Sequence, residues 1–358
     1  MKDTSPKIRI KDIATLAGVS EGTVDRVLHK RGDVSQKSLD AVNKILEEIN
    51  YTPNLIARSL ASKKQYKFVC LFPQFQHGEY WQSVDNGFDI AAQEFIHHNV
   101  HIEKRFFDQF DVESFIQVSR SICEENMDAV IMAPIFKDEC LVFIKQLREL
   151  NIPFSFIDSM IEDSDFVTYY GQNSFQSGSI AAKLLFNSIA PNEKMLVIRT
   201  QRKGAVSNQT LNRYNGFNQY LNDKKSTKVI ELIHVEFKDD DENSNLEVLR
   251  EVFKNHQNIG AAITFNSKVY RLAMHLETLK IQNVKLIGYD LLEQNVAYLK
   301  QDVISYLIAQ RPDKQAYYTV NDLCKKLIFK QEFQNINFMP IDLLIKENIE
   351  YYLGFKEE

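Results

Sequence analysis

Polar and aromatic side chains that could bind a small molecule stand directly after the predicted strands in the long C-terminal part of this sequence. Ligands of open α/β sheets bind where the carboxyl ends of parallel strands meet. Carboxylates and amides at that edge can hydrogen-bond a ligand, and aromatic rings can stack on it. The candidate residues chosen by this position are Phe75, Tyr80, Trp81, Phe136, Asp158, Ser159, Arg213, Asn266, Asp290 and Gln310, with Gln172 and Asn173 beside them.

An enzyme is the competing class, and the common catalytic motifs are absent from the sequence. There is no G-x-G-x-x-G after a strand, no G-x-x-x-x-G-K-[ST] loop, no H-E-x-x-H and no G-x-S-x-G. His97, His98 and His101 lie close together, but without a carboxylate or cysteine at ligand spacing they favour a surface position over a metal site. We therefore expect no enzyme activity, no metal and no cofactor.

A second candidate site lies near the N-terminus, where apolar residues recur at helical spacing from Ile10 onward. Gly18 predicts a tight turn after a first short helix, and Ser20 is placed to cap a second. Ser35 is placed to cap a third helix. The second helix has an apolar face of Val24, Val27 and Leu28, which leaves Glu21, Gly22, Asp25, Arg26 and His29 outside. Two short helices around a glycine turn predict a helix-turn-helix, whose second helix fits the DNA major groove.

The motif A-x-x-A-G-V-S-x-x-T-V-x-R-V-L, then V-S, then Y-x-P-N-x-x-A-R-S-L, resembles the head and hinge of the LacI/GalR family of bacterial transcription regulators. The resemblance implies that the head binds double-stranded operator DNA. It also implies a hinge helix that folds when two copies meet in the minor groove, where Leu60 wedges between base pairs. A three-helix unit without a DNA role, followed by an ordinary linker, is the alternative. The DNA-binding residues implied are Lys11, Ser20, Glu21, Thr23, Arg26, His29, Asn54, Ala57, Arg58 and Leu60.

From Tyr66 the sequence alternates between strand-like apolar runs and amphipathic helices. This alternation predicts parallel sheets covered by helices on both faces, and a length of about 290 residues favours two lobes. The expected strands are 67–73, 101–107, 129–133, 154–158, 195–200, 228–237, 261–265, 285–290 and 304–309. The expected helices are 84–97, 112–126, 141–150, 174–189, 212–222, 246–255, 269–279 and 292–301.

Several short motifs of this region resemble the type I periplasmic-binding-protein fold that the same family uses to sense small molecules. They are I-P-F-S-F-I-D at 152–158, Y-G-Q-N-S-F-Q-S-G at 170–178, R-Y-N-G-F at 213–217, I-G-Y-D at 287–290 and A-Q-R-P at 309–312. The resemblance implies that the aromatic candidates stack on a ring and that Asn266, Asp290 and Gln310 hydrogen-bond hydroxyl groups. The implied partners are a sugar or related metabolite and a second copy of the chain.

The sequence departs from the family pattern in both parts. Phe136, Ser159 and Ser267 stand where sugar-binding relatives often carry a charged residue, an arginine and an aspartate, which weakens the case for a simple pentose or hexose. In the head, Asp25 and His29 replace the usual serine and asparagine. The operator sequence therefore does not follow from the resemblance.

Charge and composition agree with a DNA-binding head on a larger body. Residues 1–66 hold twelve Lys and Arg against eight Asp and Glu, while the remainder holds 31 against 40. The four cysteines are scattered in apolar contexts and are expected to be reduced core thiols. No signal peptide and no run of about 20 apolar residues is present, so a cytoplasmic protein without a membrane segment is expected.

The sequence thus predicts three parts: a helix-turn-helix domain at 1–52, a hinge at 53–65 and an effector-binding and dimerisation domain at 66–358. We expect the chain to cross between the two lobes near 161–167, 300–312 and 328–338. The predicted function is a transcription regulator, most simply a repressor, whose operator affinity a small effector controls. The alternative is a solute-binding sensor of the same body fold without a direct DNA role. Whether the effector releases or recruits DNA is left open.

Overall fold

The computed structural model describes residues 9–28, 32–49, 64–200, 207–238 and 241–354, which divide into a head within Met1–Ala61 and a body within Ser62–Glu358. In the head, helices α1 (Ile10–Ala17), α2 (Glu21–Leu28) and α3 (Gln36–Glu48) surround a small apolar core. Its fully buried members are Ile13, Ala14, Val24, Val27 and Val42. The helical apolar spacing of the sequence is therefore confirmed.

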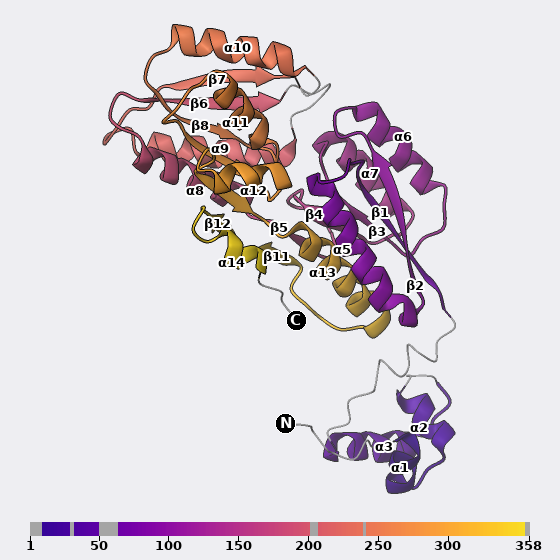
Figure 1. The fold of residues 1–358 in the computed structure, drawn as a ribbon. Helices are drawn as coiled ribbons and strands as arrows, with labels where there is room; N and C mark the ends of the chain where they lie inside the picture. The colour runs from indigo at the N-terminus through magenta and orange to yellow at the C-terminus, as the bar shows by residue number, and fades with distance from the viewer. Residues whose placement is uncertain (1–8, 29–31, 50–63, 201–206, 239–240, 355–358) are drawn as a thin grey trace. The chain divides into compact units, whose positions relative to one another are not determined.

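The first lobe of the body is a sheet of six parallel strands in the order β11-β5-β4-β3-β1-β2. Helix α5 packs against α13, and α6 packs against α7 (Figure 1). The strands are β1 (Tyr66–Pro73), β2 (Val100–Phe107), β3 (Ala129–Met132), β4 (Phe154–Asp158), β5 (Tyr169–Gln172) and β11 (Ile336–Met339). The helices are α5 (Tyr80–Phe95), η1 (Ile96–His98), α6 (Val112–Cys123), α7 (Lys137–Glu149), α13 (Pro312–Cys324) and η2 (Lys325–Phe329).

The second lobe repeats this plan with the order β12-β10-β9-β8-β6-β7, in which only β12 pairs antiparallel. The strands are β6 (Lys194–Thr200), β7 (Leu232–Phe237), β8 (Ile259–Thr264), β9 (Lys285–Tyr289), β10 (Tyr306–Ala309) and β12 (Asp342–Leu344). The helices are α8 (Ser174–Ser188), α9 (Asn208–Asp223), α10 (Glu242–Asn255), α11 (Val269–Thr278), α12 (Glu293–Lys300) and α14 (Ile349–Gly354). Two doubly wound lobes are the architecture that the sequence predicts.

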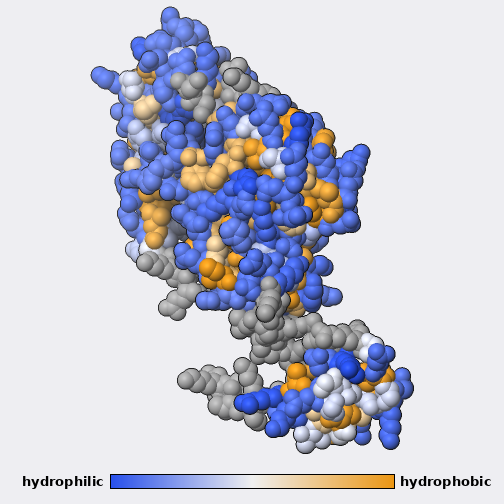
Figure 2. Space-filling model, turned by 90° about the vertical axis from the view of Figure 1, so that its right-hand side faces the viewer, coloured by the Kyte–Doolittle hydropathy of each residue, from blue (hydrophilic) through white to orange (hydrophobic). Residues whose placement is uncertain are grey.

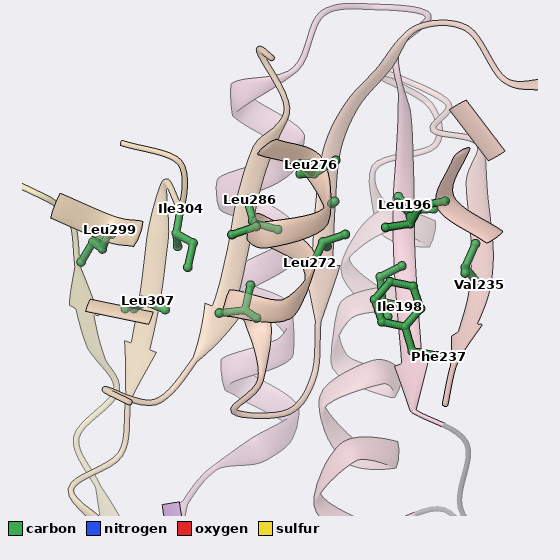
Figure 3. Packing of buried hydrophobic residues seen from close by; sticks show 14 of the residues in the cluster. Leu196, Ile198, Val235, Phe237, Leu272, Leu276, Leu286, Leu299, Ile304 and Leu307 are labelled. Atoms are coloured by element: carbon green, nitrogen blue, oxygen red, sulfur yellow. The ribbon is translucent and has the colours of Figure 1, made fainter. Parts of the chain in front are cut away.

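Each face of the second sheet carries its own apolar layer, as a parallel sheet requires. On one face, Leu196 and Leu286 from the strands meet Leu272 and Leu276 of α11 (Figure 3). On the other face, the strands meet α8 and α9, where Leu185 and Phe217 are fully buried. The surface seen in Figure 2 is mainly hydrophilic, with hydrophobic residues in separate patches. The apolar side chains that recur periodically in the sequence therefore face the interior of the lobe.

The chain crosses between the lobes at three places, and two of the expected crossings are wrong. The crossings lie between β5 and α8 at 172–174, between β10 and α13 at 309–312, and between β11 and β12 at 339–342. The second falls within the expected 300–312. Crossings near 161–167 and 328–338 were expected because β5 and β11 have no recognisable apolar run. Each strand has only four residues, and these include polar ones.

Two further expectations need adjustment. The helix expected from residue 84 begins at Tyr80, so Tyr80 and Trp81 lie in the first turn of α5 and not in a loop. Cys70, Cys140 and Cys324 are buried thiols as predicted, while Cys123 is only half-buried. None of the helices in the described ranges is long and apolar enough to cross a membrane.

Candidate functional site

The head contains the expected turn between two helices. Gly18 adopts a left-handed conformation with φ 66°, and its neighbour Val19 donates its amide to the carbonyl of Ala14 over 3.0 Å. Ser20 then accepts a hydrogen bond from the amide of Thr23 at 3.1 Å, and the two hydroxyls lie 2.9 Å apart. Ser20 therefore caps α2 as predicted, and both hydroxyls already have partners within the head.

The remaining DNA-binding candidates of the described head lie outside its core. Lys11 on α1, with Glu21 and Arg26 on α2, is exposed, whereas Thr23 is half-buried. Val24 and Val27 hold the opposite face of α2 against α1 and α3. Helix α2 therefore presents a polar face of the size that enters a major groove. His29, Asn54, Ala57, Arg58 and Leu60 lie outside the described residues.

In the body, two carboxylates occupy equivalent places on the facing edges of the two sheets. Asp158 ends β4 and Asp290 follows β9, and these strands hold the same position in the two strand orders. Both aspartates have φ 69°, a left-handed conformation that turns the chain sharply at the strand end. The turn places both side chains in the cleft between the lobes, where they line one cavity.

Donors from both lobes converge on the carboxylate of Asp158. The hydroxyl of Tyr80 donates to Oδ1 at 2.8 Å, and Nε2 of Gln209 donates to the same oxygen at 2.7 Å. Because Gln209 lies on α9 of the second lobe, this bond joins the lobes. Burial, together with the charges of Asp158 and Asp290, raises the pKa of Tyr80 well above its ordinary value, so the hydroxyl remains a donor.

Asp290 has a different environment. Nε2 of Gln310 donates to its Oδ1 at 2.8 Å. Burial raises the pKa of Asp290 to about 7; the nearby charge of Asp158 adds to the rise, while Arg213 and the bond from Gln310 oppose it. The carboxyl of Asp290 can therefore be present in both protonation states near neutral pH.

Arg213 lies beside Asp290 with most of its hydrogen-bonding capacity unused. The guanidinium carbon lies 3.8 Å from the ring centre of Tyr289, and Nη1 donates to the carbonyl of Phe265 at 2.9 Å. The residue is 1% exposed, yet Nε and Nη2 have no hydrogen-bond partner among the described residues. Buried donors without acceptors are costly, so this site is suited to a ligand that brings acceptors.

Asn266 and Trp81 complete the predicted set at this cavity, which has a volume of about 60 Å³. The side chain of Asn266 donates to Thr200 at 2.6 Å and accepts from the amide of Lys268 at 2.9 Å. Trp81 is 5% exposed and its ring meets that of Tyr80 edge-on, with centres 4.9 Å apart. The structure thus brings together Tyr80, Trp81, Asp158, Arg213, Asn266, Asp290 and Gln310.

Three predicted binding residues do not line this cavity. Phe75 stacks at 6.4 Å on Phe72 of β1, and Phe136 lies in the core of the first lobe with Phe107 and Phe115. Ser159 is buried and its hydroxyl lacks a partner among the described residues. Phe75 and Phe136 follow their strands as predicted, but their rings pack with other phenylalanines of the first lobe.

Residues that the sequence reasoning missed bridge the lobes. Gln209 is one of them, and its place four residues before Arg213, on the same face of α9, was the available signal. Another is Lys268, whose Nζ lies 3.3 Å from Oε1 of Glu79 in the opposite lobe. Asn208 also donates its side-chain amide to the carbonyl of Met160 at 3.0 Å. The lobes are therefore closed on one another by polar contacts.

A larger cavity of about 690 Å³ adjoins the smaller one. It shares Glu79, Tyr80, Asp290 and Gln310 with the smaller one. The cleft therefore contains a smaller and a larger chamber that adjoin at these four residues.

Comparison with known proteins agrees with this division into head and body. Residues 9–54 match the model for bacterial regulatory proteins of the lacI family, and residues 68–331 match a periplasmic binding protein domain. The regulator MalR of Streptococcus pneumoniae is 27% identical over 73% of this chain and 76% of its own length. The ribose operon repressor of Lactococcus lactis is 25% identical over 78% of this chain and 80% of its own.

A solved structure agrees as well. A protein assigned as a LacI transcriptional regulator in Bacteroides fragilis is 37% identical and has a TM-score of 0.76, covering 81% of this chain and all of its own. The matches extend over both the helix-turn-helix head and the two-lobed body. The chain therefore belongs to the LacI family of bacterial transcription regulators.

Proposed function

We propose that the protein is a homodimeric, cytoplasmic repressor that binds operator DNA through α2 and the hinge, and that a sugar or related metabolite between its lobes controls this binding. Two relatives, named ribose operon repressor and sucrose operon repressor, support a sugar as the class of effector. Paired heads would each contact half of a pseudo-palindromic site.

The observation that carries the effector proposal is the unpaired guanidinium of Arg213 beside Asp290. Nε and Nη2 need acceptors, and the Asp290 carboxylate can accept from a ligand donor in addition to Gln310. A hydroxyl group both donates and accepts, so neighbouring hydroxyls on a sugar ring match this pair. Trp81 and Tyr80 supply rings beside it on which a sugar face can pack. A ligand bound to both lobes would also change the balance between closed and open forms.

Effector binding can be tested with intrinsic fluorescence, because Trp81 is the only tryptophan. Operator fragments are first selected from the host genome, and metabolites of the neighbouring genes are then titrated into the protein. The true effector should shift the emission of Trp81 and change operator affinity over the same concentration range. An effector that changes operator affinity but leaves the emission unchanged, and that Asp290→Ala binds normally, would place the site elsewhere.

DNA binding by the head is tested through its salt dependence. Affinity for the selected operator should fall steeply between about 50 and 200 mM salt, because phosphate contacts release counterions. If the side chain of Arg26 contacts phosphate, Arg26→Ala should reduce the slope of log affinity against log salt concentration by about one. Leu60→Ala should weaken specific more than non-specific binding, since the wedge is used only in the bent complex. Salt-independent binding, or equal loss on random DNA, would count against the proposed contacts.

A further inference from the structure

The larger chamber of the cleft is too big to be only the entrance to the smaller one. Its volume of about 690 Å³ falls in the upper half of the range of roughly 300–1,000 Å³ that small-molecule sites occupy. The smaller chamber, at about 60 Å³, lies far below that range. A ligand hydrogen-bonded to Arg213 therefore extends beyond the smaller chamber.

The side chains shared by the two chambers show where such a ligand passes. Tyr80, Asp290 and Gln310 line both, and Asp290 stands next to Arg213 in the smaller one. A ring that places one hydroxyl on Asp290 can thus continue past Gln310 into the larger chamber. The two chambers form one path, with Asp290 at the junction.

Part of the lining of the larger chamber comes from the C-terminal helix α14. Tyr352 is held in place there, because its hydroxyl donates to Oδ2 of Asp342 at 2.8 Å and the guanidinium of Arg311 lies 5.8 Å from its ring centre. Tyr351 beside it is 81% exposed although it lines the chamber. A large exposed ring in a cavity wall is an unused surface for stacking.

The polar lining of the larger chamber suits a neutral, hydroxyl-rich group. Asp313 and Lys314 face it from the first turn of α13, so charges of both signs are present. Glu79 and Arg311 in the same lining are engaged in ion pairs with Lys268 and Asp342. No single sign of charge dominates, which favours a ligand with hydroxyls over a phosphate or a carboxylate.

We propose that the effector is a glycoside of at least two sugar rings. The first ring lies at Asp290 and reaches Arg213 through a hydroxyl, and the second lies in the larger chamber against Tyr351. This inference rests on the proposed sugar effector and adds its length. It assigns α14 a role in selecting oligosaccharides over monosaccharides, because the second ring is the one that covers Tyr351.

The test compares matched sugars by calorimetry on the full chain. Glucose is compared with maltose and cellobiose, galactose with melibiose, and xylose with xylobiose. At least one disaccharide should bind ten times or more tightly than its monosaccharide. Tyr351→Ala should remove most of that advantage while changing monosaccharide affinity less than twofold. Leu353→Ala, on the same helix, 48% exposed and outside the chamber lining, is the matched control and should change neither.

Two results would overturn the inference in distinguishable ways. If a monosaccharide binds as tightly as its disaccharides, or if Tyr351→Ala behaves like Leu353→Ala, the second ring is wrong but the sugar effector stands. If neither length binds in any pair, the proposed sugar effector fails and the inference fails with it.

Discussion

Asp158 and Asp290 end equivalent strands of two lobes with the same strand order, yet their surroundings differ. Asp158 accepts from the hydroxyl of Tyr80 and from Gln209 of the opposite lobe, so its charge is used to hold the lobes together. Asp290 has Gln310 as its donor and a raised pKa, with the unpaired donors of Arg213 beside it. The first lobe therefore uses its carboxylate for closure, and the second has the polar groups to which we assign the ligand in the proposed function.

The largest effect should come from removing the free donors of the second lobe. Arg213→Met should weaken effector binding by about 10- to 150-fold, because hydrogen bonds to charged groups contribute roughly 1.5–3 kcal/mol. Calorimetry with the effector measures it. Arg148→Met, at an arginine of the first lobe paired with Asp165, is the control and should bind normally. Retention of affinity within threefold by Arg213→Met would show that the second lobe does not hold the ligand through this residue.

The next prediction is that replacing each of the two carboxylates changes the stability of the protein in opposite directions. The pKa of Asp290 is raised from 3.8 to about 7, so between about pH 4 and pH 7 the native state keeps a proton that the unfolded state has lost. Stability therefore falls as the pH rises through this window and stays lower above it. Asp290→Asn should stabilise the protein at about pH 8 by at most about 4 kcal/mol, given about 1.4 kcal/mol for each of roughly three pKa units, and should have little effect below about pH 5.

Asp158→Asn is the contrasting change and should destabilise at about pH 8, because a neutral amide oxygen accepts from Tyr80 and Gln209 more weakly than a carboxylate oxygen does. Urea unfolding at two pH values measures both variants. Shifts of the same sign for the two substitutions would remove the distinction between the lobes.

A smaller effect is expected from the contact that joins the lobes. Gln209→Ala removes the bonds to Asp158, which at about 0.5–1.5 kcal/mol should lower the ratio of closed to open molecules by roughly 2- to 12-fold. Small-angle scattering of the ligand-free protein should then show a larger radius of gyration. Gln219→Ala, at an exposed position of the same helix, should leave the radius unchanged. An unchanged radius in Gln209→Ala would mean that closure depends on other contacts.

The smallest effect concerns the ion pair at the rim of the cleft. Lys268 and Glu79 are partly exposed, and pairs of this kind contribute about 0–1 kcal/mol. Lys268→Met should therefore reduce closure by less than about fivefold, and the difference from wild type should shrink at high salt. An effect larger than that of Gln209→Ala would mean that the ion pair contributes more to closure than the hydrogen bonds between Gln209 and Asp158.

The head and the strand-end carboxylates could be predicted because local rules decide them. A glycine after a helical apolar run and a serine before the next one have few alternative roles, so Gly18 and Ser20 were recognisable. Asp158 and Asp290 were recognisable because each directly follows a buried apolar run.

Other parts depend on tertiary contacts that no local pattern shows. The inward face of α13 carries the buried residues Gln315, Thr319 and Asp322. Gln315 accepts from the amide of Asp158, and Asp322 accepts from the hydroxyl of Tyr170, both in distant segments. A helix with a polar buried face does not show the apolar period that sequence reasoning uses. Gln209 was missed for a similar reason, since its partner lies in the other lobe.

The return of the chain into the first lobe also sets an order of events during synthesis. Strand β11 and helix α13 complete the first lobe, but they lie after almost all of the second lobe in the sequence (Figure 1). At about 5–20 residues per second, the ribosome makes β1 many seconds before either of them. The early strands therefore wait with the β5 edge unpaired and the face under α13 uncovered. The head, whose three helices end at Glu48, has no such delay.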